Sequence, residues 1–171
     1  MYSIIQTQTD LTGLVTLDEA KRQCRLLPSF TLDDDDLNHL IAACTELAQV
    51  YTHRLLTVGT VVAESDEYRP VIQLPWGNAT TITEVLLDDE AYTGYTFSTV
   101  TQKLKIPITY SNIKITYEAG YATLPVRVKQ GILMMISTWY NNREDYVTGM
   151  TLDTIPLSSM KALDSVRYWH V

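Results

Sequence analysis

The stretch IKITYEAGYATLPVRVKQGILMMISTWYNNRED, residues 113–145, decides the fold class that the sequence predicts. Apolar residues from Ile113 to Tyr117 alternate with polar ones, which is typical of a strand with one buried face. Gly120 breaks this strand, and Pro125 suits the first turn of a helix. A strand, a turn and a helix in immediate succession predict a mixed α+β fold.

The predicted helix after the proline has an unusually wide apolar face. Its main stripe consists of Val128, Ile132, Met135, Ile136 and Trp139. Leu133 and Tyr140 widen the stripe, so the helix is either buried centrally in its own domain or shared with a neighbouring chain. Gly131 lies near the stripe and costs about 1 kcal/mol relative to Ala in a helix, which indicates the close approach of another backbone.

Two helices are predicted before this region. Thr16 and Glu19 have the spacing of a capping box and open a short first helix. A longer helix has Asp33–Asp36 in its first turn, where negative charge is favourable. Its predicted inward positions are Leu37, Leu40, Ile41, Cys44, Leu47, Ala48, Tyr51 and Leu55, and its predicted outward positions are Asn38, Thr45, Glu46, Gln49 and Thr52.

Between about Thr57 and Tyr121 the sequence is rich in β-branched and aromatic residues with turn signals. After Pro156 a short amphipathic helix is expected, with Leu157, Met160, Leu163 and Val166 at helical spacing. We therefore predict an α+β, mainly helical fold: a bundle of about four helices with a small antiparallel β-rich insertion between the second and third. The expected single domain, 1–171, divides into segments 14–56 (helical), 57–121 (β-rich), 125–145 (helical) and 156–171 (C-terminal).

Composition restricts the function classes. The chain has 171 residues, 46% of them hydrophobic, and a formal net charge of −7. An acidic chain is poorly suited to gripping DNA phosphates, because that affinity comes mostly from Lys and Arg. No apolar run reaches the roughly 20 residues that span a bilayer, and the start of the sequence does not resemble a signal peptide. We expect a protein of the cytosol that contacts no membrane.

The chemical motifs in the sequence are weak. Asp33–Asp36 lack the alternating ligands of a calcium loop, and Asp88–Glu90 fit a solvated turn between strands. Ser158 and Lys161 have the spacing of some acyl-transfer enzymes but no partner motif. Cys24 and Cys44 belong to no metal-binding pattern. We therefore expect no catalytic residue, no cofactor and no metal site.

Taken in order, the segments resemble the head-tail connector (adaptor) proteins of tailed bacteriophages. The most specific part is residues 113–145, which resembles that family's strand, Gly-Tyr turn, proline and helix ending in an aromatic-Tyr-x-Asn-Arg-Glu sequence. The VTLDEAKRQCR helix, the LPWGNATTITEV turn and strand, and the closing IPLSSMKALDSVRYW agree in pattern. Residues 57–72 match weakly, and the sequence does not place them.

The resemblance implies a structural protein of the virion neck, assembled in the host cytoplasm. About twelve subunits would form a ring under the phage portal protein, extend the DNA channel without binding DNA specifically, and offer a platform for a stopper or tail-completion protein. Ring formation uses heterologous contacts and needs no catalytic group.

Two sets of interface residues are predicted. At the end of the third helix, a subunit interface would use Trp139, Tyr140, Arg143 and Glu144, because aromatic and Arg residues are enriched at interfaces; the alternative is capping within the chain. In the tail, portal binding would use Leu163, Arg167, Tyr168 and Trp169. The alternative there is that the short helix packs back on the third helix.

Two other classes of function remain open. One is a different neck component, such as a stopper or tail terminator, which we would expect to be richer in β-structure. The other is a small metal-binding module or enzyme that works through the aspartates of Asp33–Asp36 or Asp88–Glu90.

Overall fold

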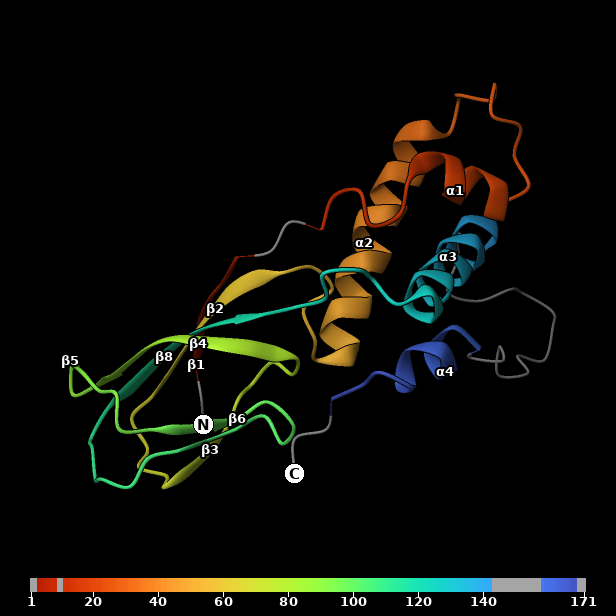
Figure 1. Ribbon diagram of the computed structural model, residues 1–171. Helices are drawn as coiled ribbons and strands as arrows, with labels where there is room; N and C mark the ends of the chain where they lie inside the picture. The colour runs from red at the N-terminus through yellow and green to blue at the C-terminus, as the bar shows by residue number, and fades with distance from the viewer. Residues whose placement is uncertain (1–2, 9–10, 143–157, 169–171) are drawn as a thin grey trace, which may run out of the picture. The chain divides into compact units, whose positions relative to one another are not determined.

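The computed structural model describes residues 3–8, 11–142 and 158–168. The chain divides into two compact units, each built from segments that are separated in the sequence (Figure 1). The helical unit comprises Leu11–Thr52 and Leu124–Arg167, and the β unit comprises Met1–Asp10, His53–Thr123 and Tyr168–Val171. The predicted α+β fold class is confirmed: the described residues form four helices, and antiparallel strands lie between the second and the third.

The helical unit contains α1 (Leu17–Gln23), α2 (Asp34–Thr52), α3 (Val126–Asn141) and α4 (Ser158–Asp164). The predicted capping box opens α1. The Thr16 hydroxyl accepts a hydrogen bond from the Glu19 N–H at 3.3 Å, and the Glu19 carboxylate accepts one from the Thr16 N–H at 2.9 Å. These reciprocal bonds satisfy two backbone donors at the start of the helix.

The central element of the helical unit is α3, which contacts α1, α2 and α4. Val128, Ile132, Met135 and Ile136 are buried, as the predicted stripe requires. Of the two explanations for its wide apolar face, central burial within its own unit therefore accounts for these four residues.

The prediction of which side of α2 faces outward was wrong for three residues. Thr45, Gln49 and Thr52 were expected on the outward side but are buried. The reason is that α2 contacts α1, α3 and α4, so its buried face is wider than its apolar stripe. The Thr45 hydroxyl donates to the Ile41 carbonyl at 2.6 Å and that of Thr52 donates to the Ala48 carbonyl at 2.8 Å, which makes burial of these polar groups possible.

The second helix also ends earlier than its apolar pattern suggests. It stops at Thr52, and His53 has a left-handed backbone with φ 49°. Leu55, which continues the helical spacing, lies instead in the buried cluster of the β unit. The helical period therefore extends by chance beyond the residue at which the helix ends.

The β unit contains two antiparallel sheets. The five-stranded sheet has the order β1 (Ser3–Gln8), β2 (Gly59–Ser65), β8 (Ile113–Ala119), β4 (Ala79–Leu87) and β5 (Glu90–Ala91). The three-stranded sheet has the order β3 (Val71–Gln73), β7 (Lys103–Lys105) and β6 (Thr96–Ser98). The sequence did not predict β1. Residues 57–72, which the family resemblance did not place, contain β2, the strand between β1 and β8, in the region whose composition predicted β-structure.

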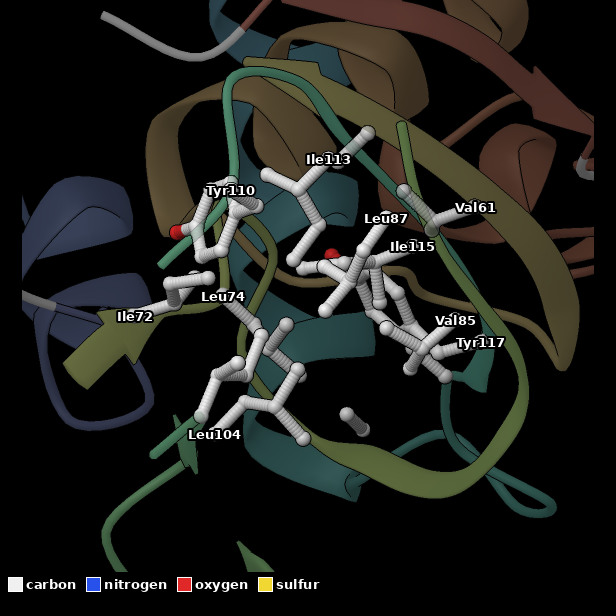
Figure 2. Packing of buried hydrophobic residues seen from close by; sticks show 14 of the residues in the cluster. Val61, Ile72, Leu74, Val85, Leu87, Leu104, Tyr110, Ile113, Ile115 and Tyr117 are labelled. Carbon is white, nitrogen blue, oxygen red and sulfur yellow. The ribbon is translucent and has the colours of Figure 1, made fainter. Parts of the chain in front are cut away.

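The core of the β unit takes side chains from both sheets (Figure 2). Ile113, Ile115 and Tyr117 of β8 are buried, as their alternation predicted. Ile72 and Leu104 of the three-stranded sheet belong to the same cluster. Each small strand thus has one face on this core, and its alternate residues lie on the outward face.

Candidate interaction surfaces

Of the residues predicted to form a subunit interface at the end of α3, one is exposed and another contacts a residue of the same chain. Trp139 is 40% exposed, although the rest of its stripe is buried. Tyr140 is half-buried, and its hydroxyl donates to the carboxylate of Asp33, next to the start of α2. Tyr140 therefore links two helices of its own unit, while Trp139 presents apolar area to the outside.

The remaining residues of that interface, Arg143 and Glu144, lie outside the described residues. Just before them, Asn142 ends the helix: its N–H donates to the Thr138 carbonyl at 3.0 Å, and its side-chain amide donates to the same carbonyl at 2.9 Å. Among the described residues, Asn142 therefore caps this end of the helix.

Leu163, the first residue of the predicted portal-binding set, is fully buried in the helical unit. It lies on α4, which contacts α3 and α2. A Cβ placed on Gly131 of α3 would lie 3.2 Å from the Ser159 carbonyl oxygen and 3.3 Å from Cδ2 of Leu163. The close backbone approach that the glycine indicated is therefore made by α4, and the packing of this helix on α3, raised as an alternative, is observed.

Arg167 contacts α2 through the side chain of Tyr51. Its guanidinium lies 4.4 Å from the centre of the Tyr51 ring, within the range of a cation–π contact. The Tyr51 hydroxyl donates to the Asp164 carboxylate at 2.6 Å, and this bond raises the pKa of Tyr51. The end of α4 is thereby attached to α2.

Tyr168 is bound to the β unit. A Cβ on Gly77 would lie 2.6 Å from Cγ of Tyr168, so the ring occupies the space that this glycine leaves. The Arg54 guanidinium lies 5.7 Å from the ring centre, and burial is the main cause that raises the pKa of the Tyr168 hydroxyl. Trp169, the last residue of the predicted set, lies outside the described residues.

In each of the two acidic segments, one aspartate has a structural role within its unit. Asp34 forms an ion pair with the buried ammonium of Lys21 at 2.6 Å. The Asp88 carboxylate accepts hydrogen bonds from the N–H groups of Ser111 at 3.0 Å and Asn112 at 2.8 Å. In the parts of the chain that the structure describes, no group of three or more His, Cys, Asp or Glu side chains is arranged to hold a metal ion.

The thiols of Cys24 and Cys44 are in surroundings that lower their reactivity. Cys44 is buried, and its burial raises the pKa of the thiol to about 12. Cys24 is half-buried, and burial is also the main cause that raises its pKa. Since the thiolate is the reactive form, neither thiol is activated at neutral pH.

A surface that the sequence analysis missed lies on the outward side of the three-stranded sheet. Pairing puts Val71, Lys105 and Thr96 in one cross-strand row, and Lys103 and Ser98 together in the next. We call this surface the lysine face; an open depression of about 470 Å³ on it is lined by Val71, Thr96, Ser98, Thr101, Lys103 and Lys105. The sequence signal was the alternation of KLK, which places both lysines on the side opposite the buried Leu104.

Among the described helices, none combines the length and the apolar character needed to cross a bilayer.

Comparison with known proteins gives matches of fold only. No protein-family model and no curated protein matches the chain. A chain of a solved structure described as "Neck of empty GTA particle computed with C6 symmetry" matches with a TM-score of 0.75 and 19% identity, over 100% of this chain and 97% of that one.

Two further matches cover the same shares of the two chains, each at 17% identity. They belong to "Virion of native gene transfer agent (GTA) particle", with a TM-score of 0.74, and "Neck of native GTA particle computed with C12 symmetry", with 0.73. At these identities the likeness establishes a shared fold along the whole chain.

Proposed function

We propose that the protein is a structural component of the neck of a tailed phage or phage-like particle, located in the virion between head and tail. The observation that carries the proposal is the match over the whole chain with chains of GTA particles; of the three structures named above, two are described as necks. A shared fold does not by itself fix function. Here it agrees with an independent resemblance of residues 113–145 to the connector family.

Within the neck, we propose the adaptor role: a ring of about twelve subunits under the portal, which extends the DNA channel and receives the next neck or tail protein. The cyclic symmetries given for the matched neck structures, C6 and C12, support a ring arrangement. The helical unit supports an adaptor over a stopper or tail terminator, for which we would expect more β-structure. The role requires no catalysis.

For contacts between subunits we propose Trp139 as the apolar anchor, together with Arg143 and Glu144. The support is that Trp139 is the one residue of its stripe that α1, α2 and α4 leave exposed, among those the structure describes. Large aromatic side chains contribute most when they become buried at an interface. Tyr140 contributes by holding this end of α3 to α2.

For contacts with the portal we propose the end of the chain, with Trp169 as the side chain that enters the partner. The observed contacts assign a different part to its neighbours. Leu163 holds α4 on α3, while Arg167 and Tyr168 each bind a side chain of their own unit. These three residues would fix the position of the tail, and Trp169 would provide the binding contact.

The decisive experiment is co-expression with the portal protein of the same particle, followed by sizing and electron microscopy. We expect portal complexes that carry one additional ring of this protein, with subunits in the cyclic symmetry of the portal. Free protein can remain monomeric when the template is absent. Failure to bind the portal would overturn the adaptor role, and binding at the tail side of a preassembled neck would favour the stopper.

A further inference from the structure

We propose that the lysine face of one copy binds the acidic hairpin tip, Asp89 and Glu90, of a second copy. The contact joins two different patches of the β unit, so repetition of it is head-to-tail and can close a ring. This inference rests on the proposed function and names one contact by which the ring forms.

The lysine face carries positive charge that the described residues do not neutralise by an ion pair. Lys103 and Lys105 form no ion pair with any residue that the structure describes. By contrast, Arg69 pairs with Glu67 at 2.7 Å and Lys114 pairs with Glu64 at 2.9 Å. Two like charges on one face of a short strand repel each other, so a carboxylate placed between them is favourable.

The depression beside the lysines provides further donors. Thr96, Ser98 and Thr101 line it, and their hydroxyls can donate hydrogen bonds to carboxylate oxygens. Most of the exposed lining of the depression is apolar, and Val71, which is 43% exposed, contributes to it. An apolar lining that also carries ammonium groups and hydroxyls suits a protein segment, because such a segment brings apolar atoms as well as carboxylates.

The hairpin between β4 and β5 is such a segment, and hydrogen bonds define its turn. Leu87 pairs with Glu90 across a two-residue turn in which Asp88 and Asp89 have φ values of 51° and 68°. Positive φ at both positions is the geometry of a type I′ turn, which fits the twist of a hairpin. The Asp88 carboxylate accepts hydrogen bonds from the backbone N–H groups of Ser111 and Asn112, just before β8, so the turn is attached to that segment.

Asp89 and Glu90 are the carboxylates of this turn that remain available. Both are exposed, and neither forms an ion pair within the described part of the chain. The pKa of Lys114 is raised mainly by its hydrogen bond to Glu64, and the charge of Asp89 contributes only a little to this shift. We call these two residues the acidic tip.

Charge favours a second copy over DNA as the occupant of the lysine face. The chain has a net charge of −7, which opposes the approach of a duplex, and two lysines neutralise few phosphates. A second copy brings two carboxylates on a hairpin turn, the same number of charges as the two lysines of the face. Complementary charges of this kind fix the orientation and register of an interface.

Two variants test the contact. Lys103→Glu/Lys105→Glu makes the lysine face acidic, and Asp89→Asn/Glu90→Lys makes the acidic tip basic while an Asn keeps the left-handed turn position. Either variant alone puts like charges in contact at every joint, so we expect ring yield on the portal to fall more than about tenfold. An equimolar mixture restores opposite charges at every joint when the two variants alternate, and we expect rings to return.

Matched controls separate this contact from a general effect of charge. Arg22→Glu/Arg127→Glu changes the net charge by the same amount as the first variant, on exposed residues of the helical unit. Thermal unfolding of every variant shows whether it is folded. We expect the control to form rings as the wild type does.

The outcomes separate this inference from the proposal on which it rests. If the wild type binds the portal as a ring and the variants do so equally well, the contact is wrong and the adaptor role stands. Loss of rings without rescue in the mixture also overturns the contact. If the wild type forms no ring on the portal, both proposals fail. Salt-sensitive binding of duplex DNA by the wild type that the lysine variant loses, with rings intact, assigns the face to phosphates instead.

Discussion

Gly120 and Gly13 both have a positive φ, of 123° and 76°, but only Gly120 is enclosed by other atoms. A Cβ on Gly120 would lie 2.0 Å from the Thr57 carbonyl oxygen, whereas one on Gly13 meets nothing within 4 Å. We expect Gly120→Ala to lower the free energy of unfolding by more than about 3 kcal/mol, because backbone must move. Chemical denaturation of the purified protein measures this.

Gly13→Ala is the control for backbone conformation alone. It should cost only about 1–2 kcal/mol, the strain of a side chain at left-handed φ. Equal losses for the two variants would show that the close approach of the chain around Thr57 does not determine the requirement for glycine at position 120.

Glu19 joins two roles in one side chain. Its carboxylate completes the capping box of α1 and forms an ion pair with Lys129 of α3 at 2.6 Å. The hydrogen bond from Lys129, and next that from the Thr16 N–H, lower the pKa of Glu19 below its usual 4.5. A lowered pKa in the folded state means stability that is present above pH 4.5 and is lost as the pH falls through the folded value.

We therefore expect Glu19→Gln to reduce the melting temperature at pH 7 and to have little effect at a pH below the folded pKa. Gln retains the capping geometry and removes only the charge. Glu46→Gln, on the exposed side of α2, is the control and should change little at either pH. A difference between Glu19→Gln and wild type that does not depend on pH would contradict this account.

At the scale of elements, the sequence correctly predicted those features of helices and strands that depend on neighbouring residues in the chain. The capping box at Thr16, the alternation in β8 and the apolar stripe of α3 each depend on residues close together in the chain, and each is found. The close approach indicated by Gly131 was also correct, although the sequence could not say that α4 makes it.

The misses involve long-range contacts. β1 exists through pairing with β2, more than fifty residues later, and short strands have no stability of their own. Thr45 and Thr52 read as surface residues, but both are buried with their hydroxyls bonded to the preceding turn. The lysine face depends on three strands that only the fold brings together. Residue type alone therefore could not show that the two threonines are buried or that the two lysines share a face with other strands.

The short helix α4 provides a prediction about an element. Seven residues are too few for a stable isolated helix, so α4 depends on the packing of Leu163 against α3. We expect Leu163→Ala to lower the free energy of unfolding by about 2–5 kcal/mol, the usual cost of emptying a fully buried leucine site. Lys161→Ala, on the exposed side of the same helix, should cost less than about 0.5 kcal/mol.

Denaturant titration measures both variants, and portal binding should be measured beside it. If Leu163 acted mainly as a contact with the portal, Leu163→Ala would keep its stability and lose the portal. We expect instead that Leu163→Ala lowers the free energy of unfolding, and that any loss of portal binding follows from this instability.

At the scale of the whole molecule, the chain passes between its two units at residues 10–11, 52–53, 123–124 and 167–168. The last of these passages lies between Arg167, bound to Tyr51 in the helical unit, and Tyr168, bound beside Gly77 in the β unit. The two residues joined by this peptide bond thus contact different units: Arg167 contacts the helical unit and Tyr168 contacts the β unit. The tail that the sequence assigned to a partner begins as part of the protein's own structure.

Under the proposed function, the residues of the tail would have different roles. Trp169 directly follows the docked Tyr168, so the docking of Tyr168 determines where Trp169 starts. We expect Trp169→Ala to weaken portal attachment by about 2 kcal/mol or more, the range of an interface hot spot, without a change in melting temperature. Tyr168→Ala should lower the melting temperature as well, because it removes a half-buried ring from the β unit.

Gly77→Ala tests the positioning role without touching the tail. Its Cβ would lie 2.6 Å from Cγ of Tyr168, so the ring must shift while the Tyr168 and Trp169 side chains remain present. We expect portal affinity to fall toward that of Trp169→Ala, because Trp169 then starts from an undefined position. Thermal melting and portal pull-down of Gly77→Ala, Tyr168→Ala and Trp169→Ala distinguish the possibilities. Portal affinity equal to wild type in Gly77→Ala, with affinity lost in Trp169→Ala, would show that Trp169 finds the portal without help from Tyr168.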